Sequence, residues 1–516
     1  MKVRKSSFDL THERKLTAKA DGTLYPIFCE ATLPGDSWRI NSEILARMTP
    51  LVNPVYHRFD IFTHFFFVPN RLVWKNWGEF IFPTTTVQDA VDLPCAYVVP
   101  NATNPLTGNY FPVSYLAAGT LGDHLGCSFD STNQLSVQAQ VTISMLPFRA
   151  YALIWNEFFR DQDLQKKINV SVEDSFDYET EEDILKLQKK CWEKDYFTTA
   201  RPWAQKGDAS RVSINHGEYP IAPDSVSDVN NGPLGTLYMN ATGGLVAANN
   251  ATPIAGQAQD VAIAGNGEGF TIEDLRHASA VQRFLEKLSR SGSRYIEAIQ
   301  SFFGVRVKDY RLQRPEFIGG GRQPVVISEV LQTSQSDTTP LGTYGGHGIS
   351  SGGSGSSYFC PEHGYIIGLM SIMPRAGYVH SMRKEFFKLD KFEFFLPEFA
   401  ALGDQPIMNI EINGDLTSAF QRATFGYQER FSEYKFIPST VHGQFKSDAV
   451  LKNFVADRND MEYELNEDFV QVTDQDDTDR IYAISTDTYD PFLVSVLHKV
   501  HAIRPVPLHP SQHHVI

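Results

Sequence analysis

The pattern of apolar and polar positions from Tyr56 to Val68 predicts a β-strand. Apolar side chains recur at every second position, as they do when successive residues point to opposite faces of a strand. One face holds Phe59, Ile61, Thr63, Phe65 and Phe67. Because the opposite face also carries bulky groups near its end, we expect the strand to be buried on both sides. Pro69 has no N–H to donate to a sheet, so the strand should end there.

A second long strand is predicted near the C-terminus, from Phe492 to Ile503. One face of it holds Phe492, Val494, Val496, Val500 and Ala502. The prolines of Arg504-Pro505-Val506-Pro507 should stop this strand, because they cannot donate to a hydrogen-bonded ladder. Further strand candidates lie at 24–33, 365–373, 392–396 and 433–436. Strands this far apart, joined by long and varied connections, are typical of a β-sandwich whose loops carry its specialised functions.

Helical periodicity is confined to the connections. From Thr271, which opens a capping box, apolar residues recur at helical spacing as far as Leu288. Other helices are predicted at 150–159, 181–193 and 295–302. Apolar stripes of this kind favour packing against a core over a dedicated groove for a partner.

Two stretches of low complexity interrupt these elements. Residues 222–267 contain no Lys or Arg, and their composition is typical of a long surface insertion or a disordered loop. Residues 338–357 are rich in Gly and Ser and predict a flexible surface loop. The run Gly348-Ile349-Ser350-Ser351-Gly352 matches the G-x-S-x-G nucleophile elbow, which needs a strand before it and a helix after it. Its place inside a Gly/Ser stretch argues against a hydrolase.

The chain is acidic, with a formal net charge of −15, but the charge is unevenly placed. Residues 455–490 hold twelve acidic residues against two arginines, whereas residues 1–20 form a basic arm with six cations against two acids. Because Lys and Arg bind phosphate without reading sequence, and an aromatic ring stacks on an unpaired base, this arm is a candidate for binding DNA. A merely solvated terminus is the alternative. The candidate residues are Lys2, Arg4, Lys5, Phe8, Arg14 and Lys15, with Arg504 as a secondary one.

The spacing of the Cys, His and Asp residues gives only weak evidence for metal binding or redox chemistry. The five cysteines are scattered and never spaced as a metal-binding pair, which is typical of reduced thiols. His498 and His501 stand three residues apart, a spacing that sends them to opposite faces of a strand. An acidic cluster that resembles half of a calcium-binding loop consists of Asp474, Asp476, Asp477 and Asp479. We expect no cofactor and interpret the cluster as a hydrated loop, with a structural divalent cation that bridges subunits as the alternative.

Several short motifs occur in an order that is found in one protein family. They are Phe8-Asp9-Leu10, Leu33-Pro34-Gly35-Asp36, Phe67-Val68-Pro69, Arg71-Leu72-Val73-Trp74, Leu146-Pro147-Phe148-Arg149-Ala150-Tyr151, Trp155-Asn156-Glu157, Arg294-Tyr295-Ile296-Glu297, Phe303-Gly304-Val305, the run from Arg311 to Gly320, and Phe425-Gly426-Tyr427-Gln428-Glu429-Arg430. Over nearly its whole length the chain thus resembles the major capsid proteins of the microviruses, small tailless single-stranded DNA bacteriophages, and of their gokushovirus branch in particular. One such motif is weak evidence, whereas many in a constant order are not a chance match.

The resemblance implies a structural protein rather than an enzyme. Its fold would be mainly β, a viral eight-stranded jelly-roll barrel with long loop insertions that contain short helices. One capsid domain would cover residues 1–516, with strands dispersed between about 24 and 504. Sixty copies would form a T=1 icosahedral shell through pentamers around a circular single-stranded DNA genome. The virion would assemble in the host bacterial cytoplasm, and residues 222–267 would form a threefold protrusion that meets the host cell.

The implied partners are further copies of the chain, the DNA genome, an internal scaffolding protein, a DNA pilot protein, a small basic DNA-binding protein and a host surface receptor, without insertion into a membrane. Residues of the matching motifs are candidates for ion pairs within or between subunits, because Arg is favoured in such pairs. They are Arg294, Tyr295, Arg311, Arg314, Glu316, Tyr427, Glu429 and Arg430. The alternative function is that of a stand-alone β-sandwich, a carbohydrate-binding or cupin-like protein, which would remain a monomer or small oligomer.

Overall fold

The computed structural model describes residues 5–52, 55–82, 93–99, 108–128, 141–207, 237–239, 245–247, 272–291, 294–304, 308–331, 344–375, 377–400, 403–414, 421–448, 450–456, 458, 464–473, 480–484, 486 and 489–508. The chain divides into two compact units. One unit combines Met1–Ala204 with Arg290–Ile516, and the other is Gln205–Ser289.

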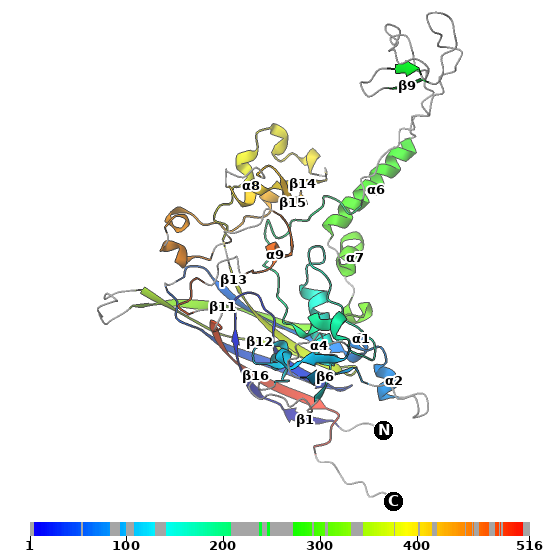
Figure 1. The fold of residues 1–516 in the computed structure, drawn as a ribbon, viewed down its shortest axis with the longest axis vertical. Helices are drawn as coiled ribbons and strands as arrows, with labels where there is room; N and C mark the ends of the chain where they lie inside the picture. The colour runs from blue at the N-terminus through cyan, green and yellow to red at the C-terminus, as the bar shows by residue number, and fades with distance from the viewer. Residues whose placement is uncertain are drawn as a thin grey trace, which may run out of the picture. The chain divides into compact units, whose positions relative to one another are not determined.

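The first unit is built on one curled antiparallel sheet that folds into two layers (Figure 1). The first layer has the strand order β1 (Ser6–Asp9) and β2 (His12–Ala18), both paired with β16 (Phe492–Arg504), then β4 (Ser37–Met48) and β12 (Tyr344–Phe359). The second layer has the order β11 (Glu316–Leu331), β5 (Phe59–Pro69), β13 (Gly364–Pro374) and β3 (Tyr25–Thr32). The two layers are joined at β11, whose first part pairs with β5 and whose last part pairs with β12.

This strand order confirms the predicted jelly roll. Because β1 and β2 lie end to end along β16, they act as one broken edge strand, so that each layer has four strands. Eight antiparallel strands in two layers are the jelly-roll arrangement. The neighbours β2 and β16 come from opposite ends of the chain, and their pairing brings the two termini together in the first layer.

The main apolar core lies between the two layers. It contains the inward-facing residues predicted for the two long strands, including Phe59, Ile61, Phe65 and Phe67 of β5. Phe66 and Val68 of the same strand point the other way into a second core, which confirms that β5 is buried on both sides. Full burial of each such side chain contributes about 2 to 3 kcal/mol, so β5 is among the elements that hold the domain together.

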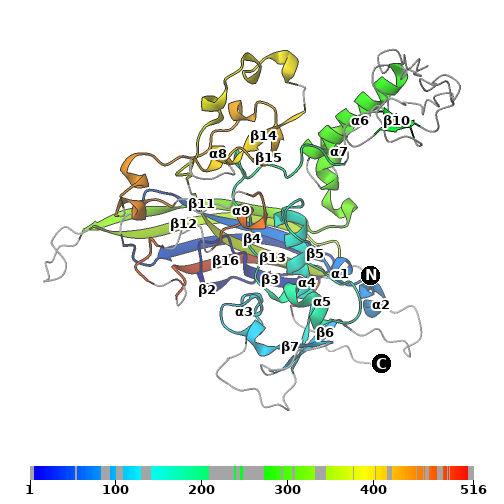
Figure 2. The same ribbon diagram turned by 45° about the horizontal axis from the view of Figure 1, so that its top comes forward.

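The described residues between 70 and 185, in the connection that follows β5, pack against the outer side of the second layer. Their short elements are α1 (Asn70–Val73), α2 (Trp77–Ile81), β6 (Cys95–Val99), β7 (Tyr110–Pro112), α3 (Leu121–Leu125), β8 (Val141–Ser144), α4 (Leu146–Ile154) with a π-helical turn (Trp155–Phe159), and α5 (Tyr178–Glu181). Phe148 and Tyr151 of α4 pack in the second core with Phe66 of β5 and Ile367 of β13. Figure 2 shows α3 beside β3 and α4 beside β13.

A third core is shared by residues 191–200 and the connection from β13 to β16. This connection contributes β14 (Asp404–Met408), α8 (Asn409–Ile412), β15 (Thr424–Glu429) and α9 (Glu467–Val470). Phe197, Tyr378 and Phe469 are buried together in it. The core fixes the base of the aromatic segments described below.

The second unit contains β9 (Leu237–Met239), β10 (Leu245–Ala247) and most of α6 (Ile272–Arg290). The two strands pair with each other in an antiparallel manner. Residues 222–267, predicted as a surface insertion, lie outside the described residues except for these two strands. The predicted helices at 271–288 and 295–302 are confirmed by α6 and by α7 (Tyr295–Phe303) of the first unit.

The prediction of a flexible loop over residues 338–357 is wrong, because Tyr344–Phe359 is the long strand β12. Its glycines fit where a larger side chain would not. A Cβ added at Gly348 would lie 2.3 Å from Sδ of Met48, and one at Gly352 would lie 2.4 Å from Oε1 of Gln323. The stretch that matches a nucleophile elbow is therefore the middle of a regular strand.

Three shorter predictions are also wrong. Residues 392–396 and 433–436 form no strand, and their segments contain the 3-10 turns Lys391–Glu393 and Ser432–Tyr434. The helix predicted at 181–193 ends after a 3-10 turn at Leu185. Beyond it the backbone extends beside β3, where N–H of Leu24 donates to O of Gln188 at 2.9 Å. Pairing with the barrel thus overrides the helical spacing of the apolar residues.

Candidate assembly and DNA-facing surfaces

Two segments of the β13 to β16 connection form an exposed apolar surface, which we call the aromatic knob and define as residues 384–399 and 428–437. Six large apolar side chains of its first segment are between 38% and 92% exposed, namely Phe386, Leu389, Phe392, Phe394, Phe395 and Leu396. The second segment adds Tyr434, Phe436 and Ile437. Phe395 connects the two segments, with its ring 5.2 Å from that of Phe431. Apolar side chains gathered in this way mark interaction sites.

A buried ion pair holds the knob in one shape. Nζ of Lys388 lies 2.6 Å from Oε1 of Glu433, and both side chains are almost fully buried. Burial opposes both charges, but the ion pair prevails, so that the pKa of Lys388 lies above its usual value and that of Glu433 below it. The side chain of Gln405 donates to Glu433 at 2.7 Å and accepts from N–H of Phe431 at 3.1 Å. The knob is therefore ordered before any partner arrives.

Three predicted interface residues lie at this knob, with contacts inside one chain. Nη2 of Arg430 donates to O of Phe392 at 3.2 Å, and its guanidinium lies 5.2 Å from the ring of Phe431. Glu429 pairs with Lys435. Tyr427 exchanges two backbone hydrogen bonds with Arg201, at 2.7 and 2.9 Å. These residues position the knob's second segment.

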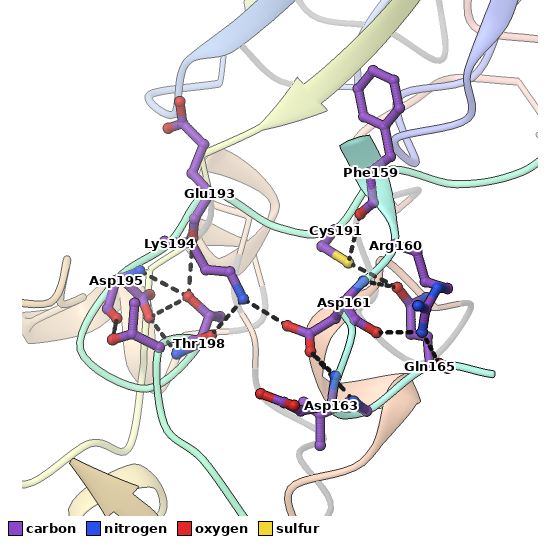
Figure 3. Close-up of polar contacts among 12 residues, drawn as sticks. Phe159, Arg160, Asp161, Asp163, Gln165, Cys191, Glu193, Lys194, Asp195 and Thr198 are labelled. Carbon is purple, nitrogen blue, oxygen red and sulfur yellow. Dashed lines mark hydrogen bonds and ion pairs between the residues drawn. The ribbon is translucent and has the colours of Figure 1, made fainter. Parts of the chain in front are cut away.

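A polar network ties the segment 191–200 to the loop after α4 (Figure 3). Nζ of Lys194 lies 2.8 Å from Oδ2 of Asp161 and donates to O of Thr198 at 3.1 Å. Burial would raise the pKa of Asp161, but Lys194 and two backbone N–H groups hold that pKa below its usual value. Sγ of Cys191 donates to Oε1 of Gln165 at 3.2 Å. The network braces the third core from the side of the barrel.

Asp195 extends this network toward the knob. Its carboxylate accepts from the hydroxyl of Tyr378 at 2.7 Å, and that hydroxyl accepts from Nη1 of Arg458 at 2.9 Å. Burial raises the pKa of Tyr378 well above its ordinary value, so the phenol stays protonated and donates. A buried chain of hydrogen bonds of this kind rigidifies the region that carries the knob.

Arg294 and Arg314, two more of the predicted interface residues, also make side-chain contacts within the chain. Arg294 caps α7 through Glu297 at 3.1 Å and donates to O of Arg160 at 2.8 Å. Arg314 pairs with Asp309 at 2.8 Å. Burial raises the pKa of Glu316 at the start of β11. The predicted set further includes Arg311, which is exposed, and Tyr295, whose side chain lies outside the described part of the structure.

Of the N-terminal cations, Arg14 and Lys15 lie on a strand, β2. Lys2 and Arg4 lie outside the described residues, and Lys5 donates to O of Gly35 at 2.6 Å. Residues 6–18, expected as part of a basic arm, form β1 and β2. Phe8 is half-buried opposite Ala502.

The other DNA-binding candidates differ in how many contacts their side chains make within the chain. Nε of Arg504 donates to Asp36 at 3.0 Å, and its guanidinium lies 5.1 Å from the ring of Trp38. Nη1 of Arg14 donates to O of His124 at 2.9 Å. Lys15 is 78% exposed in its side chain, and only a distant Glu13 carboxylate at 3.9 Å approaches it. Lys15 is therefore the most available of the described members of this set.

Among the described residues no group of three or more His, Cys, Asp and Glu side chains could hold a metal ion. The acidic cluster Asp474, Asp476, Asp477 and Asp479 lies outside that part of the chain, and its role stays a prediction. His498 and His501 point to opposite faces of β16, as their spacing predicts, with His498 buried and His501 exposed. Of the helices described, none has the length and apolarity needed to span a bilayer.

The whole chain matches one family of virus proteins. The family model described as "Capsid protein (F protein)" matches residues 1–512. The chain belongs to this capsid protein family. Among its relatives, capsid protein VP1 of Chlamydia phage 1 is 30% identical, over 98% of this chain and 95% of the relative. Capsid protein VP1 of Bdellovibrio phage phiMH2K is 35% identical, over 86% of this chain and 83% of the relative. Capsid protein VP1 of Spiroplasma virus 4 is 29% identical, over 83% of this chain and 80% of the relative.

This membership confirms the resemblance found in the sequence motifs. The protein is a major capsid protein of a microvirus, and its role is structural rather than enzymatic. It is part of the virion and assembles with copies of itself and the viral genome. An exposed aromatic knob on a rigid jelly roll is the kind of surface that such assembly buries.

Proposed function

We propose that sixty copies of this chain form a T=1 icosahedral shell, built through pentamers, around a circular single-stranded DNA genome. The observation that carries the proposal is a complete jelly roll with an exposed, pre-ordered apolar surface, in a chain that matches a capsid family over residues 1–512. Closed point-group symmetry turns a few repeated contacts into a finite shell. The aromatic knob supplies one of these contacts.

The shell is stabilised by repetition rather than by any single strong interface. Each contact in such a shell can be weak, because a subunit in the closed particle is held by several neighbours at once. Weak contacts let misplaced subunits leave during assembly, whereas strong ones would trap errors. The knob suits this task because its ion pair and hydrogen bonds order it in advance, which lowers the entropy cost of association.

The proposal includes several partners. An acidic chain with a net charge of −15 that encloses DNA needs other cations near the genome, which a small basic DNA-binding protein would supply. An internal scaffolding protein would guide assembly in the bacterial cytoplasm, and a DNA pilot protein would accompany the genome. Residues 222–267 would form a threefold protrusion that binds a host surface receptor.

Electron microscopy and sedimentation of the protein from phage-infected or co-expressing cells test the shell. Sixty chains of 58.0 kDa give a uniform particle of about 3.5 MDa before the genome is added. A stable dimer that binds sugar, even with scaffold present, would contradict the shell and support the stand-alone β-sandwich instead.

A further inference from the structure

A turn with two exposed cations precedes β11, and we call residues 308–312 the cationic turn. It contains the 3-10 segment Asp309–Leu312. Nζ of Lys308 lies 6.0 Å from the ring of Tyr310, and the guanidinium of Arg311 lies 5.9 Å from it. A hydrogen bond from Arg311, together with its charge, lowers the pKa of the Tyr310 phenol. Among the described residues, no carboxylate forms an ion pair with Lys308 or Arg311.

The acids beside the cationic turn already have partners or are half-buried. Oδ1 of Asp309 lies 2.8 Å from Nη2 of Arg314. Oε2 of Glu362 lies 2.7 Å from Nε of Arg71. Burial raises the pKa of Glu316, so this carboxyl group is less readily ionised than an exposed one. The two cations of the turn are therefore available to an acidic partner.

Side-chain hydrogen bonds fix the turn at the end of β5. Nη1 of Arg71, which follows β5, donates to Oε1 of Gln313. Nε2 of Gln313 in turn donates to O of Tyr310 at 3.0 Å. Glu316, the first residue of β11, pairs with Phe67 near the last residue of β5. The cationic turn thus lies at the C-terminal end of β5 and is ordered in the single chain.

An acidic segment leaves the fold at the other end of β5. We call residues 474–479 the acidic loop, because four of the six are aspartates and none is a cation. The loop lies outside the described residues, but the residues that flank it do not. Val472 is buried in one cluster with Phe62, near the start of β5. O of Ile481 accepts from N–H of Val52 at 3.0 Å, in the connection that leads into β5.

The cationic turn and the acidic loop of one chain are therefore separated by most of the length of β5. From Phe62 to Pro69 the strand advances by seven residues, which is about 23 Å. A loop of six residues that leaves and returns at one end of the strand extends by about three residues, or about 10 Å. Contact within one chain would require the loop to stretch along the outer side of β5, where Trp192 and α4 already pack. Contact between two copies requires no such path.

We propose that the acidic loop of one copy binds the cationic turn of the next copy. This inference rests on the proposed function and deepens it, because it names a contact that joins the chains of the pentamer. The two surfaces differ and lie at opposite ends of one strand, so the contact is head to tail. A head-to-tail contact repeats from copy to copy and closes into a ring when the rotation between copies permits. Opposite charges steer the copies together and fix their register.

An exchange of charges tests the contact. Lys308→Glu with Arg311→Glu places like charges opposite the acidic loop, and Asp476→Lys with Asp477→Lys places them opposite the cationic turn. In cells that also produce the scaffolding protein, either pair should lower the fraction of chain that sediments as closed particles by about tenfold or more. A chain with all four substitutions again has opposite charges at the contact and should recover assembly.

The matched control is Lys166→Glu with Lys167→Glu, which makes the same change of charge at two exposed residues of the loop after α4. It should assemble normally. Normal assembly of either exchanged pair, an equal loss in the control, or no recovery in the chain with four substitutions would overturn the inference. A lower thermal midpoint of the unassembled chain in both exchanged pairs would place the contact within one chain and overturn it as well.

A disulfide measurement does not depend on a loss of assembly. Particles of a chain with both Arg311→Cys and Asp477→Cys, oxidised with diamide, should give a ladder of linked chains that ends at five on a non-reducing gel. Chains with either substitution alone should give no ladder. A ladder that stops at two chains would indicate a symmetric contact and overturn the head-to-tail arrangement. Closed particles without any link would refute this inference alone, whereas absence of closed particles from the wild type would refute the proposed shell.

Discussion

His498 is buried in the main core as a neutral imidazole. Its Nε2 donates to O of Ile27 at 2.9 Å, because a carbonyl oxygen can only accept, and its Nδ1 accepts from the hydroxyl of Ser42 at 2.7 Å. Burial lowers the pKa of His498 to about 4. A proton on Nδ1 would break the bond from Ser42 and place a charge among apolar side chains.

This burial predicts a fold that weakens in mild acid. The pKa of His498 is near 6.5 in the unfolded chain and about 4 in the folded chain. The contribution of the neutral imidazole to folding stability is therefore complete above pH 6.5, and it is lost as the pH falls toward 4. The loss from this residue is at most about 1.4 kcal/mol per pH unit. His498→Gln should therefore show a smaller fall in thermal midpoint between pH 7 and pH 5 than the wild type. His501→Gln, which changes an exposed histidine of the same strand, is the control, and equal falls in all three proteins would contradict the prediction.

The residue scale also shows what composition can and cannot predict. Arg294, Arg314 and Arg504 were singled out by their residue type and motif, but each is engaged in contacts within its own chain. Whether such a cation finds a partner depends on which neighbours the fold supplies, and these can come from distant segments, as Asp36 does for Arg504.

At the scale of elements, strands with strong apolar alternation were predictable, and β5 and β16 begin and end within about three residues of their predicted limits. The strand β12 was not predictable, since glycine and serine carry no apolar period. It is specified by its partners: Ile349 to Phe359 pair with β4, and its glycines fit against Met48 and Gln323. The strands predicted at 392–396 and 433–436 were wrong for the opposite reason. The apolar residues of these segments lie on an exposed surface and do not belong to a sheet.

The aromatic knob yields a prediction at this scale. Leu389 is 92% exposed, so Leu389→Asp removes no internal contact and should leave the far-ultraviolet circular dichroism and the thermal midpoint of the single chain unchanged. A charge buried without a partner at a subunit contact is strongly unfavourable, so the fraction of chain that sediments as particles should fall at least tenfold. Leu389→Met keeps the surface apolar and should assemble normally. Normal assembly of the Asp variant would show that the knob faces solvent in the virion.

At the scale of the whole molecule, the layered sandwich followed from the spacing of strands, and its jelly-roll form from the family motifs. The neighbours within each layer could not be predicted from periodicity, because β2 and β16, or β4 and β12, are joined only in the folded state. The orientation of the layers likewise depends on where the long connections pack. Those connections cover the second layer, whereas alternate residues of β4 in the first layer are exposed.

The last prediction concerns residues 222–267, which belong to a compact unit of their own, Gln205–Ser289. A unit with its own internal contacts can be shortened without loss of the jelly-roll core, so a virus that lacks residues 222–267 should still form particles of normal sedimentation. If this insertion binds the host receptor, those particles should no longer adsorb, measured as genome copies that remain in the supernatant after incubation with host cells. A variant with the same number of Gly and Ser residues in place of 222–267 keeps the chain length and should fail in the same way, because adsorption depends on the side chains. Particles that adsorb normally would place attachment elsewhere, and failure of both variants to assemble would make the insertion part of the shell.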